Sequence, residues 1–441
     1  MWDSSVVWAA DSSGAPKGLI YFETYGCTLN KADTALMKSL ALEKGYGIAE
    51  TPEEAEIIVV NTCTVRLDTE VRMLRRLQEL HKLFGDSKRI VVAGCMAAAQ
   101  PYTIKRLLPR ALLVSPQNIT RFLEAVESGQ DLILGERDTT YLKPYVEGAV
   151  AAVPIAEGCL GQCSFCITKI ARRRLRSYRA EIVVRAIEEA VRRGAVEIEL
   201  AAQDSGCYGL DIGSRLPDLV REILDRVKGR YVLRIGMANP DTVLNILDDL
   251  VEVLREPRVY KYLHVPLQSA DDRVLKLMRR RYTYDEFRGL VLELRRKVVG
   301  ISIATDIIVG HPGEDDEAFE RTLRAVEELQ FDKVHIAQYT IRPRTESAAM
   351  KQVPESVKKL RSGILSKLVE KVGLEINREY VGSLAKVLVT HRSIRGSAVG
   401  RTYNYKPVVL VGSEDRYRLG DEYTVFISSA TFFDLRGYVS S

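Results

Sequence analysis

The chain has 441 residues, of which 46% are hydrophobic and 28% are charged, and its formal net charge is +5. This composition is typical of a folded protein with several domains and excludes an intrinsically disordered chain. No apolar run approaches the roughly 18 residues of a membrane helix. Residues 1–16 lack the pattern of a secretory signal and are expected to form a flexible tail.

Apolar runs alternate with helical patterns in the first region, residues 17–142. The runs at 19–22, 55–60, 90–93 and 112–114 predict buried parallel strands, and the stretches 31–43 and 66–83 predict helices between them. This rhythm is typical of a doubly wound, flavodoxin-like α/β domain.

Three cysteines close three of these predicted strands: Cys27, Cys63 and Cys95. Their separations are 63 − 27 = 36 and 95 − 63 = 32 residues, one β-α-β unit each. Because consecutive parallel strands place their carboxyl ends on one edge, we expect the three thiols to converge there. Gly26 and Gly94 precede two of them and let the backbone pass close to a bulky group. Three unrelated buried thiols are the alternative.

A second triplet, Cys159, Cys163 and Cys166, lies in one loop with the spacing C-x3-C-x2-C, after the apolar run 150–155. Thiolates select zinc or iron–sulfur clusters, and a zinc site would require a fourth ligand nearby. The nearest further cysteine is Cys207, which we expect not to be a ligand. Three ligands on a cubic cluster leave one iron open to a small molecule. A disulfide or inert loop, a zinc knuckle and a four-ligand electron-transfer cluster remain alternatives.

The second region, residues 143–354, contains six further predicted strands, at 152–156, 197–201, 231–236, 262–266, 302–309 and 334–339. Six β-α units are too few for a closed eight-stranded barrel, so we predict a partial (βα)6 barrel with the cysteine loop at its carboxyl face. Polar residues and glycines stand at the ends of its strands: Gln203, Asp204, Asn239, Gln268, Ser269, Asp306, Gly310, Gly313 and Tyr339.

Residues 355–378 predict a connecting helix, and residues 379–441 predict short strands at 385–390, 408–411, 423–427 and 431–435. Such strands suggest a small antiparallel barrel of OB type. Basic residues interleave there with aromatic ones, a mixture suited to RNA loops, with a solvated surface as the alternative: Arg392, Arg395, Arg401, Lys406, Arg416 and Arg418 with Tyr403, Tyr405 and Tyr417. A second basic run follows the cysteine loop: Arg172, Arg173, Arg174, Arg176 and Arg179.

The cysteine loop, with Phe165 just before its last cysteine, resembles the signature of radical S-adenosylmethionine (SAM) enzymes. The motifs TYGCTLN at 24–30, NTCTVR at 61–66 and GCM at 94–96 resemble those of the methylthiotransferases. The segments 171–178, 234–240 and 264–269 are most similar to the archaeal and eukaryotic branch, which modifies N6-threonylcarbamoyladenosine in tRNA. The resemblance covers nearly the whole chain from Gly18 onward.

The resemblance implies two [4Fe–4S] clusters, one on each cysteine triplet, with SAM held by the loop cluster, by Phe165 and by the polar strand ends. It also implies a methylthio transfer to an adenosine next to the anticodon, an RNA-binding TRAM domain over 379–441, an external electron donor, a monomer and a cytoplasmic location. No catalytic acid or base is named. The tRNA anticodon stem-loop would meet Arg172, Arg174, Arg176, Tyr178, Tyr403 and Tyr405.

The sequence departs from the pattern of that branch at Gly161, Arg173 and Arg344, where Asn, Gly and Gly are usual. These departures concern substrate specificity. The alternative substrates are isopentenyladenosine in tRNA and an aspartate of a ribosomal protein. A non-catalytic iron–sulfur sensor that binds nucleic acid is a further alternative, which leaves the polar strand ends without a role.

Overall fold

The computed structural model describes residues 16–393, 396–412 and 416–439, and it divides into two compact units. The first unit ends at Tyr145 but also includes Ile170–Arg172; the second holds Val146–Lys169 and Arg173 onward. Residues 1–15 of the expected tail, and Arg395, lie outside the described residues. Within the described ranges, no helix is long and apolar enough to cross a membrane.

The first unit is built on five parallel strands in the order β2-β1-β3-β4-β5, which is the flavodoxin-like order. The strands are β1 Leu19–Thr24, β2 Gly47–Ile48, β3 Ile57–Thr62, β4 Arg89–Gly94 and β5 Leu112–Val114. The helical elements are α1 Thr28–Glu43, α2 Leu67–Phe84, α3 Cys95–Ala99, α4 Pro101–Leu107, η1 Pro116–Arg121 and α5 Phe122–Ser128. The fold class predicted from the alternating runs is confirmed, and only the two-residue strand β2 was not foreseen.

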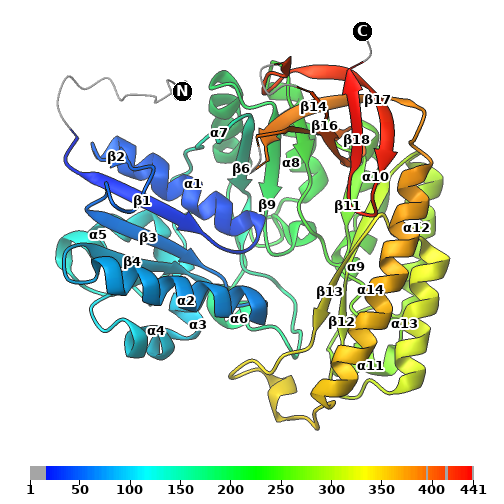
Figure 1. The fold of residues 1–441 in the computed structure, drawn as a ribbon, viewed down its shortest axis with the longest axis horizontal. Coiled ribbons are helices and arrows are strands. Elements are labelled where there is room, and N and C mark those ends of the chain that lie inside the picture. The colour runs from blue at the N-terminus through cyan, green and yellow to red at the C-terminus, as the bar shows by residue number, and fades with distance from the viewer. Residues whose placement is uncertain (1–15, 394–395, 413–415, 440–441) are drawn as a thin grey trace. The chain divides into compact units, whose positions relative to one another are not determined.

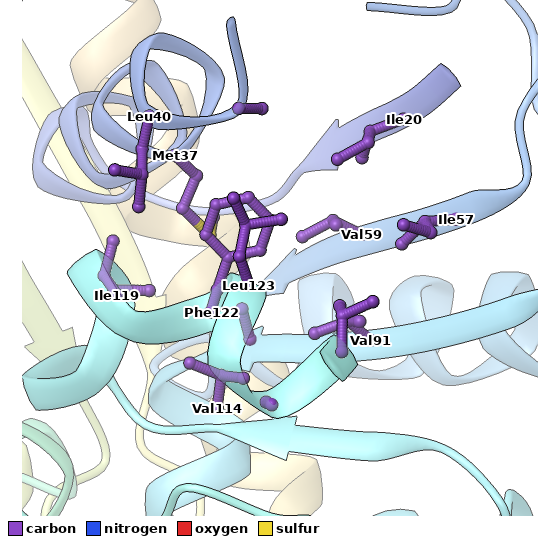
Figure 2. Close-up of a cluster of buried hydrophobic side chains, with 14 of the residues drawn as sticks. Ile20, Met37, Leu40, Ile57, Val59, Val91, Val114, Ile119, Phe122 and Leu123 are labelled. Atoms are coloured by element: carbon purple, nitrogen blue, oxygen red, sulfur yellow. The ribbon is translucent and has the colours of Figure 1, made fainter. Parts of the chain in front are cut away.

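Helices cover both faces of this sheet, with α1 and α2 on opposite sides (Figure 1). Because side chains alternate between the faces of a strand, β3 supplies both cores. Val59 packs with Val91 and Phe122 under α1 and α5 (Figure 2), whereas Ile58 packs with Leu77 of α2 on the other face. Burial on both faces explains why the strand sequence is continuously apolar.

The second unit begins with two parallel three-stranded sheets, β10-β9-β6 and β11-β12-β13, and an isolated parallel bridge pairs Leu233 of the first sheet with Val259, just before the first strand of the second. The strands are β6 Val150–Pro154, β9 Glu197–Ala201, β10 Val232–Arg234, β11 Tyr262–His264, β12 Ser302–Val309 and β13 Lys333–Gln338. The six strands follow one another in chain order, as predicted for a partial (βα)6 barrel. A short ribbon, β7 Ala156–Glu157 with β8 Arg176–Ser177, frames the cysteine loop.

Helices separate these strands as expected for β-α units. They are α6 Thr168–Arg172, α7 Ala180–Arg192, α8 Leu216–Arg226, α9 Pro240–Leu244, α10 Leu247–Arg255, α11 Asp272–Leu277, α12 Tyr284–Lys297, α13 Asp316–Leu329 and α14 Glu355–Arg378, with 3-10 turns η2 Ser205–Cys207 and η3 Glu346–Ala349. Helix α14 is the predicted connecting helix.

A closed five-stranded barrel follows, in the order β14-β15-β16-β18-β17. Its strands are β14 Leu384–Arg392, β15 Ala398–Thr402, β16 Pro407–Leu410, β17 Glu422–Ala430 and β18 Leu435–Val439. The structure corrects three details. The segment 431–435 is mostly a turn, in which Thr431 and Asp434 bond to each other, so the last strand begins only at Leu435. Strand β15 was missed, and the β16–β18 pair is parallel.

Candidate functional site: two cysteine triplets

The first triplet lies at the carboxyl edge of the first unit's sheet. Cys63 directly follows β3 and Cys95 directly follows β4, two neighbouring strands paired at Thr62 and Gly94. Cys27 precedes helix α1, after the end of β1, which pairs with β3 on its other side. Burial raises the pKa of the Cys95 thiol, and the charges of Cys63 and Cys27 add to this shift, so both cysteines interact electrostatically with Cys95.

The side chain of Asn30 contacts the carboxyl ends of three strands, β1, β3 and β4. Its Nδ2 donates to the carbonyls of Tyr25 at 2.7 Å and Thr62 at 2.9 Å, and its Oδ1 lies 3.8 Å from Cys95 Sγ. Asn61 Nδ2 in turn donates to the Asn30 carbonyl at 2.8 Å. Both asparagines lie in the sequence motifs described above, but the sequence alone assigned them no role. The role of a fully buried amide becomes apparent only from its hydrogen-bond partners.

Glycine is required next to these thiols. Gly26 has φ +111°, and a Cβ there would lie 2.8 Å from Cys63 Cβ and 3.1 Å from Cys63 Sγ. Gly94 has φ +90°, and a Cβ there would collide with Asn61 Oδ1. Burial raises the pKa of Cys63 and raises that of Cys95 to about 12, so a cation that binds here must displace protons.

The second triplet lies in the loop between β7 and α6. Gly161 N–H donates to Cys159 Sγ at 3.1 Å, and Arg280 Nη1 donates to Cys163 Sγ at 3.2 Å. Burial raises the pKa of Cys166 to about 11, and the charges of Cys163 and Cys159 add to this shift. Hydrogen bonds to sulfur and mutually repelling thiols are features of a site built for a bound cation. Arg280 was missed because it follows α11 rather than a strand.

Cys207 is fully buried in η2, and its thiol donates to the Asp204 carbonyl at 3.1 Å. Cys207 also interacts with Cys159, which lowers the pKa of Cys159 and raises that of Cys207. Cys207 is therefore a neighbour of the second triplet whose thiol hydrogen goes to the Asp204 carbonyl.

Asp204 and Asn239, expected to contact a cofactor, are bonded chiefly to the protein. Asp204 accepts from Asn239 N at 3.0 Å, Asn239 Nδ2 at 2.8 Å and Thr242 Oγ1 at 3.0 Å. Asn239 Oδ1 accepts from Arg280 Nη2 at 2.8 Å. The pair thus positions Arg280 against Cys163.

Two glutamines keep a polar atom available near the loop. Gln203 Oε1 accepts from Gly158 N at 2.6 Å, while its buried Nε2 has no hydrogen-bond partner in the described part of the chain. Gln268 has φ +69°, and its buried Oε1 also lacks a partner among the residues described. Ser269 is buried and accepts from Asp271 N at 3.3 Å.

The two glycines expected to approach a ligand face protein instead. A Cβ at Gly310 would collide with the Lys358 side chain, and a Cβ at Gly313 would collide with that of Leu277. Both residues have positive φ, +75° and +93°, so the turn after β12 depends on them.

An aromatic row lies beside this turn. The His311 ring packs edge-on against Phe165, with centroids 6.0 Å apart, and against Tyr339 at 5.2 Å. Desolvation lowers the pKa of His311 to about 4, so this imidazole is neutral at physiological pH. Phe165 and Tyr339 are thereby brought together as expected, through a histidine to which the sequence alone assigned no role.

Asp306 stands in a different environment from the other strand ends. Its carboxylate lies 3.0 Å from His264 Nε2, and the ligand atoms of Asp306, His264 and His335 all lie within 4.8 Å of one another. Two imidazoles and a carboxylate could hold a divalent cation or a polar group of a substrate.

Two residues expected to contact a substrate are buried. Tyr178 is fully buried, and its carbonyl accepts from Tyr208 Oη at 2.8 Å. Arg172 is 1% exposed and belongs to the first unit. The expectation is corrected for both, because a side chain packed inside the protein cannot reach a macromolecular partner. Arg174 is exposed and Arg176 is half-buried, so both remain accessible.

The tyrosines expected on the surface of the C-terminal barrel are also engaged elsewhere. Tyr405 packs against Tyr260 and Tyr262, with centroids 4.9 and 4.8 Å apart, so its ring is enclosed. Tyr417 is 1% exposed and belongs to the barrel core. Tyr403 is half-buried and donates to Glu422 at 2.7 Å. Burial therefore excludes stacking of Tyr417 on a partner, and the ring of the half-buried Tyr405 is occupied by Tyr260 and Tyr262.

A different face of this barrel combines cations with exposed rings. Phe426 and Tyr438 pair across β17 and β18 with centroids 5.6 Å apart, and Tyr438 is 46% exposed. Arg436, two residues before Tyr438, and Lys386 on β14 are exposed as well. We call Lys386, Phe426, Arg436 and Tyr438 the β14–β17–β18 face; its residues alternate with the core along each strand.

Comparison with known proteins connects these units to families. Residues 19–115 match the uncharacterized protein family UPF0004, residues 153–326 the radical SAM superfamily, and residues 378–439 the TRAM domain. The solved structure of TsrM from Kitasatospora setae, a radical S-adenosylmethionine methyltransferase with cobalamin and a [4Fe-4S] cluster bound, superposes with a TM-score of 0.56. It is 14% identical, and the match covers 75% of this chain and 74% of that one, so it shows the fold alone.

Curated relatives match almost the whole chain. The probable threonylcarbamoyladenosine tRNA methylthiotransferase of Methanocaldococcus jannaschii is 40% identical over 427 residues, 95% of this chain and 96% of that protein. The threonylcarbamoyladenosine tRNA methylthiotransferase of Homo sapiens is 36% identical over 85% of this chain and 66% of that protein. The chain therefore belongs to the threonylcarbamoyladenosine tRNA methylthiotransferase family and is a transferase of the radical SAM superfamily.

Proposed function

We propose that this chain transfers a methylthio group to C2 of N6-threonylcarbamoyladenosine next to the anticodon of tRNA, and that it holds two [4Fe–4S] clusters to do so. The observation that carries the proposal is the presence of two separate thiol triplets, Cys27/Cys63/Cys95 and Cys159/Cys163/Cys166, in a chain whose relatives bear the name of that reaction. The reaction would take place in the cytoplasm, by a monomer that receives electrons from an external donor.

The thiols fit iron–sulfur clusters. Each triplet would supply three cysteine ligands, and one iron of a cubane would stay open because the Cys207 thiol near the second triplet donates to the Asp204 carbonyl. N–H···S bonds from Gly161 and Arg280 favour thiolate over thiol, as second-shell donors do around iron–sulfur clusters. When bound, the clusters and SAM supply the one-electron cleavage and sulfur chemistry that side chains lack.

The second unit also offers polar atoms for SAM. Gln203 Nε2 and Gln268 Oε1 are buried and have no hydrogen-bond partner in the described residues, a state that costs free energy unless a ligand supplies the partner. Phe165 and Tyr339 would border the ligand, whereas Asp204 and Asn239 would act indirectly by holding Arg280.

The β14–β17–β18 face is the surface that best suits RNA. Lys386 and Arg436 can pair with phosphates, and the Phe426–Tyr438 pair offers rings on which unstacked bases can stack. These residues replace Tyr405 and Tyr417 as the proposed aromatic contacts. Arg174 and Arg176, beyond the cysteine loop, remain proposed contacts of the anticodon stem-loop.

The test combines iron analysis with nucleoside mass spectrometry. Anaerobically reconstituted protein should hold roughly eight iron atoms, and replacing either triplet by alanine should leave roughly four. With SAM and a reductant, tRNA that carries N6-threonylcarbamoyladenosine should gain a methylthio group, and tRNA that carries isopentenyladenosine should not. The ribosomal protein substrate of the related enzymes should stay unmodified.

Each result has a separate meaning. Formation of 5′-deoxyadenosine without a change in any tRNA would overturn the substrate and leave the radical chemistry. Roughly four iron atoms in the unaltered protein would show a single cluster and would overturn the proposal that each triplet holds one.

A further inference from the structure

Arg172 comes six positions after Cys166 in the sequence, yet it folds with the first unit. Only Ile170–Arg172 of this stretch belongs to that unit, and Gln117 Nε2 donates to the Ala171 carbonyl at 3.0 Å. Arg172 ends helix α6, because Arg173 has φ +47°, and it is among the largest side chains that are fully buried. Burying a guanidinium is costly unless it is paired, so its partners are informative.

Three hydrogen bonds place Arg172 at the first triplet. Its Nε donates to Cys95 Sγ at 3.3 Å, and its Nη2 donates to Asn30 Oδ1 at 2.7 Å and Asp33 Oδ2 at 2.6 Å. Asn30 is the residue that laces the strand ends beneath the cysteines. The guanidinium therefore bonds at the same time to the Cys95 sulfur, the Asn30 side-chain amide and the Asp33 carboxylate.

Asp33 holds the guanidinium in place. It is fully buried, and its other oxygen accepts from Arg137 Nη2 at 2.8 Å. Arg137 Nη1 also donates to the Pro116 carbonyl at 2.8 Å. Both arginines therefore bind the Asp33 carboxylate. Arg172 also donates to a cysteine, whereas the hydrogen bonds of Arg137 described above go to Asp33 and the Pro116 carbonyl.

A fixed positive charge and an N–H donor act on sulfur in a known direction. Both stabilise the more negative state, so around an iron–sulfur cluster they favour the reduced form and raise the reduction potential.

We propose that Arg172 is a positioning residue for the cluster of the first unit: it holds the Cys95 sulfur in place and raises the reduction potential of that cluster. This inference rests on the proposed function, because it presupposes a cluster on Cys27, Cys63 and Cys95. It assigns Arg172 to a cluster rather than to the substrate.

The test uses the full chain with Cys159, Cys163 and Cys166 replaced by alanine, so that only the first unit can bind a cluster. After anaerobic reconstitution, iron content, the EPR signal of the reduced cluster and its midpoint potential are measured for Arg172→Gln and Arg172→Lys. Arg137→Gln is the matched control, since it loses a bond to the same carboxylate. Arg174→Gln, at an exposed arginine two positions after Arg172, controls for the loss of a nearby positive charge that is not buried.

We expect Arg172→Gln to lower the midpoint potential, so that the ratio of reduced to oxidised cluster at a fixed applied potential falls about tenfold, while Arg172→Lys shifts it less and both controls stay near the parent. Loss of iron in Arg172→Gln but not in Arg137→Gln would support the same role through ligation.

Equal shifts or equal iron losses in Arg172→Gln and Arg137→Gln would overturn the inference and indicate a role in packing around Asp33. An unchanged potential in Arg172→Gln would overturn it as well, with the cluster itself intact. If the parent with the three alanines holds no iron, then the first unit binds no cluster. That result would overturn the part of the proposed function that places a cluster on Cys27, Cys63 and Cys95, and this inference with it.

Discussion

Tyr405, in the turn between β15 and β16 of the C-terminal barrel, donates its phenol hydrogen toward Glu199 of strand β9, with 2.9 Å between the oxygens. The same hydroxyl lies 3.2 Å from Glu197 Oε1. Both residues belong to the second unit, so the C-terminal barrel and the (βα)6 barrel are joined there by a buried polar contact. Desolvation, with the charge of Glu199, raises the pKa of Glu197, which shows how little water reaches this contact.

Tyr405→Phe should therefore lower the free energy of unfolding by about 1–3 kcal/mol, because it removes the donor and leaves buried carboxylates less satisfied. Thermal unfolding checks this. Tyr403→Phe, which loses a bond to a partly exposed carboxylate, should cost less. Affinity for tRNA should stay unchanged in Tyr405→Phe; a large loss of affinity without a loss of stability would place this ring on the RNA after all.

His311 should make stability depend on pH. Its pKa is about 4 in the folded protein against an ordinary 6.5, because burial disfavours the imidazolium. Between these values the unfolded chain binds a proton that the folded chain does not, so the free energy of unfolding falls as pH is lowered from 6.5 towards 4, by up to about 3 kcal/mol. Above 6.5 this contribution is complete. Denaturant titrations at several pH values should give a flatter profile for His311→Gln, whatever its absolute stability.

Gly26→Ala should disturb the first triplet. The added Cβ would lie 2.8 Å from Cys63 Cβ, at a φ of +111° that alanine avoids. We expect the reconstituted variant to lose up to about half of its iron, which a colorimetric iron assay measures. Gly129→Ala is the matched control, since φ is +69° but no atom lies within 4 Å of its Cβ. Similar iron losses in both variants would point to backbone strain rather than to the thiols.

Cys207→Ala should leave the iron content of the reconstituted protein unchanged, because the Cys207 thiol donates to the Asp204 carbonyl and we expect it not to be a ligand. The loop cluster should instead shift to a lower reduction potential, since it loses a polar neighbour that interacts with Cys159. Redox titration in a background without the first triplet checks this. A fall of iron to that of a Cys159→Ala variant would make Cys207 a ligand.

Tyr438→Ala should weaken tRNA binding by about 1–3 kcal/mol, the usual range for one stacked base. Arg436→Gln should weaken it too, and should reduce the steepness with which affinity falls as salt increases. Fluorescence anisotropy over a series of salt concentrations separates the two effects. Arg416→Gln, at another exposed arginine of this barrel, serves as the comparison.

Local patterns were sufficient for much of the fold. Apolar runs such as 55–60 and 90–93 predicted strands buried on both faces, and this is how β3 and β4 pack. The short C-terminal strands were harder, since β15, Ala398–Thr402, contains Gly and Arg, and pairing with β14 and β16 rather than propensity makes it a strand.

The amino-acid sequence by itself determined the fold class and the placement of both cysteine triplets at the ends of strands. Hydrophobic periodicity locates the strands, and the carboxyl ends of parallel strands lie at the same edge of a sheet. Only the tertiary structure decided which charged and aromatic side chains are accessible. Arg172 and Tyr405 looked like surface contacts in the sequence, but Arg172 is buried and Tyr405 is half-buried, and each is bonded to a partner distant in the chain, Asp33 and Glu199. Burial of a polar side chain depends on a complementary group brought near by folding, and no local pattern encodes that partner.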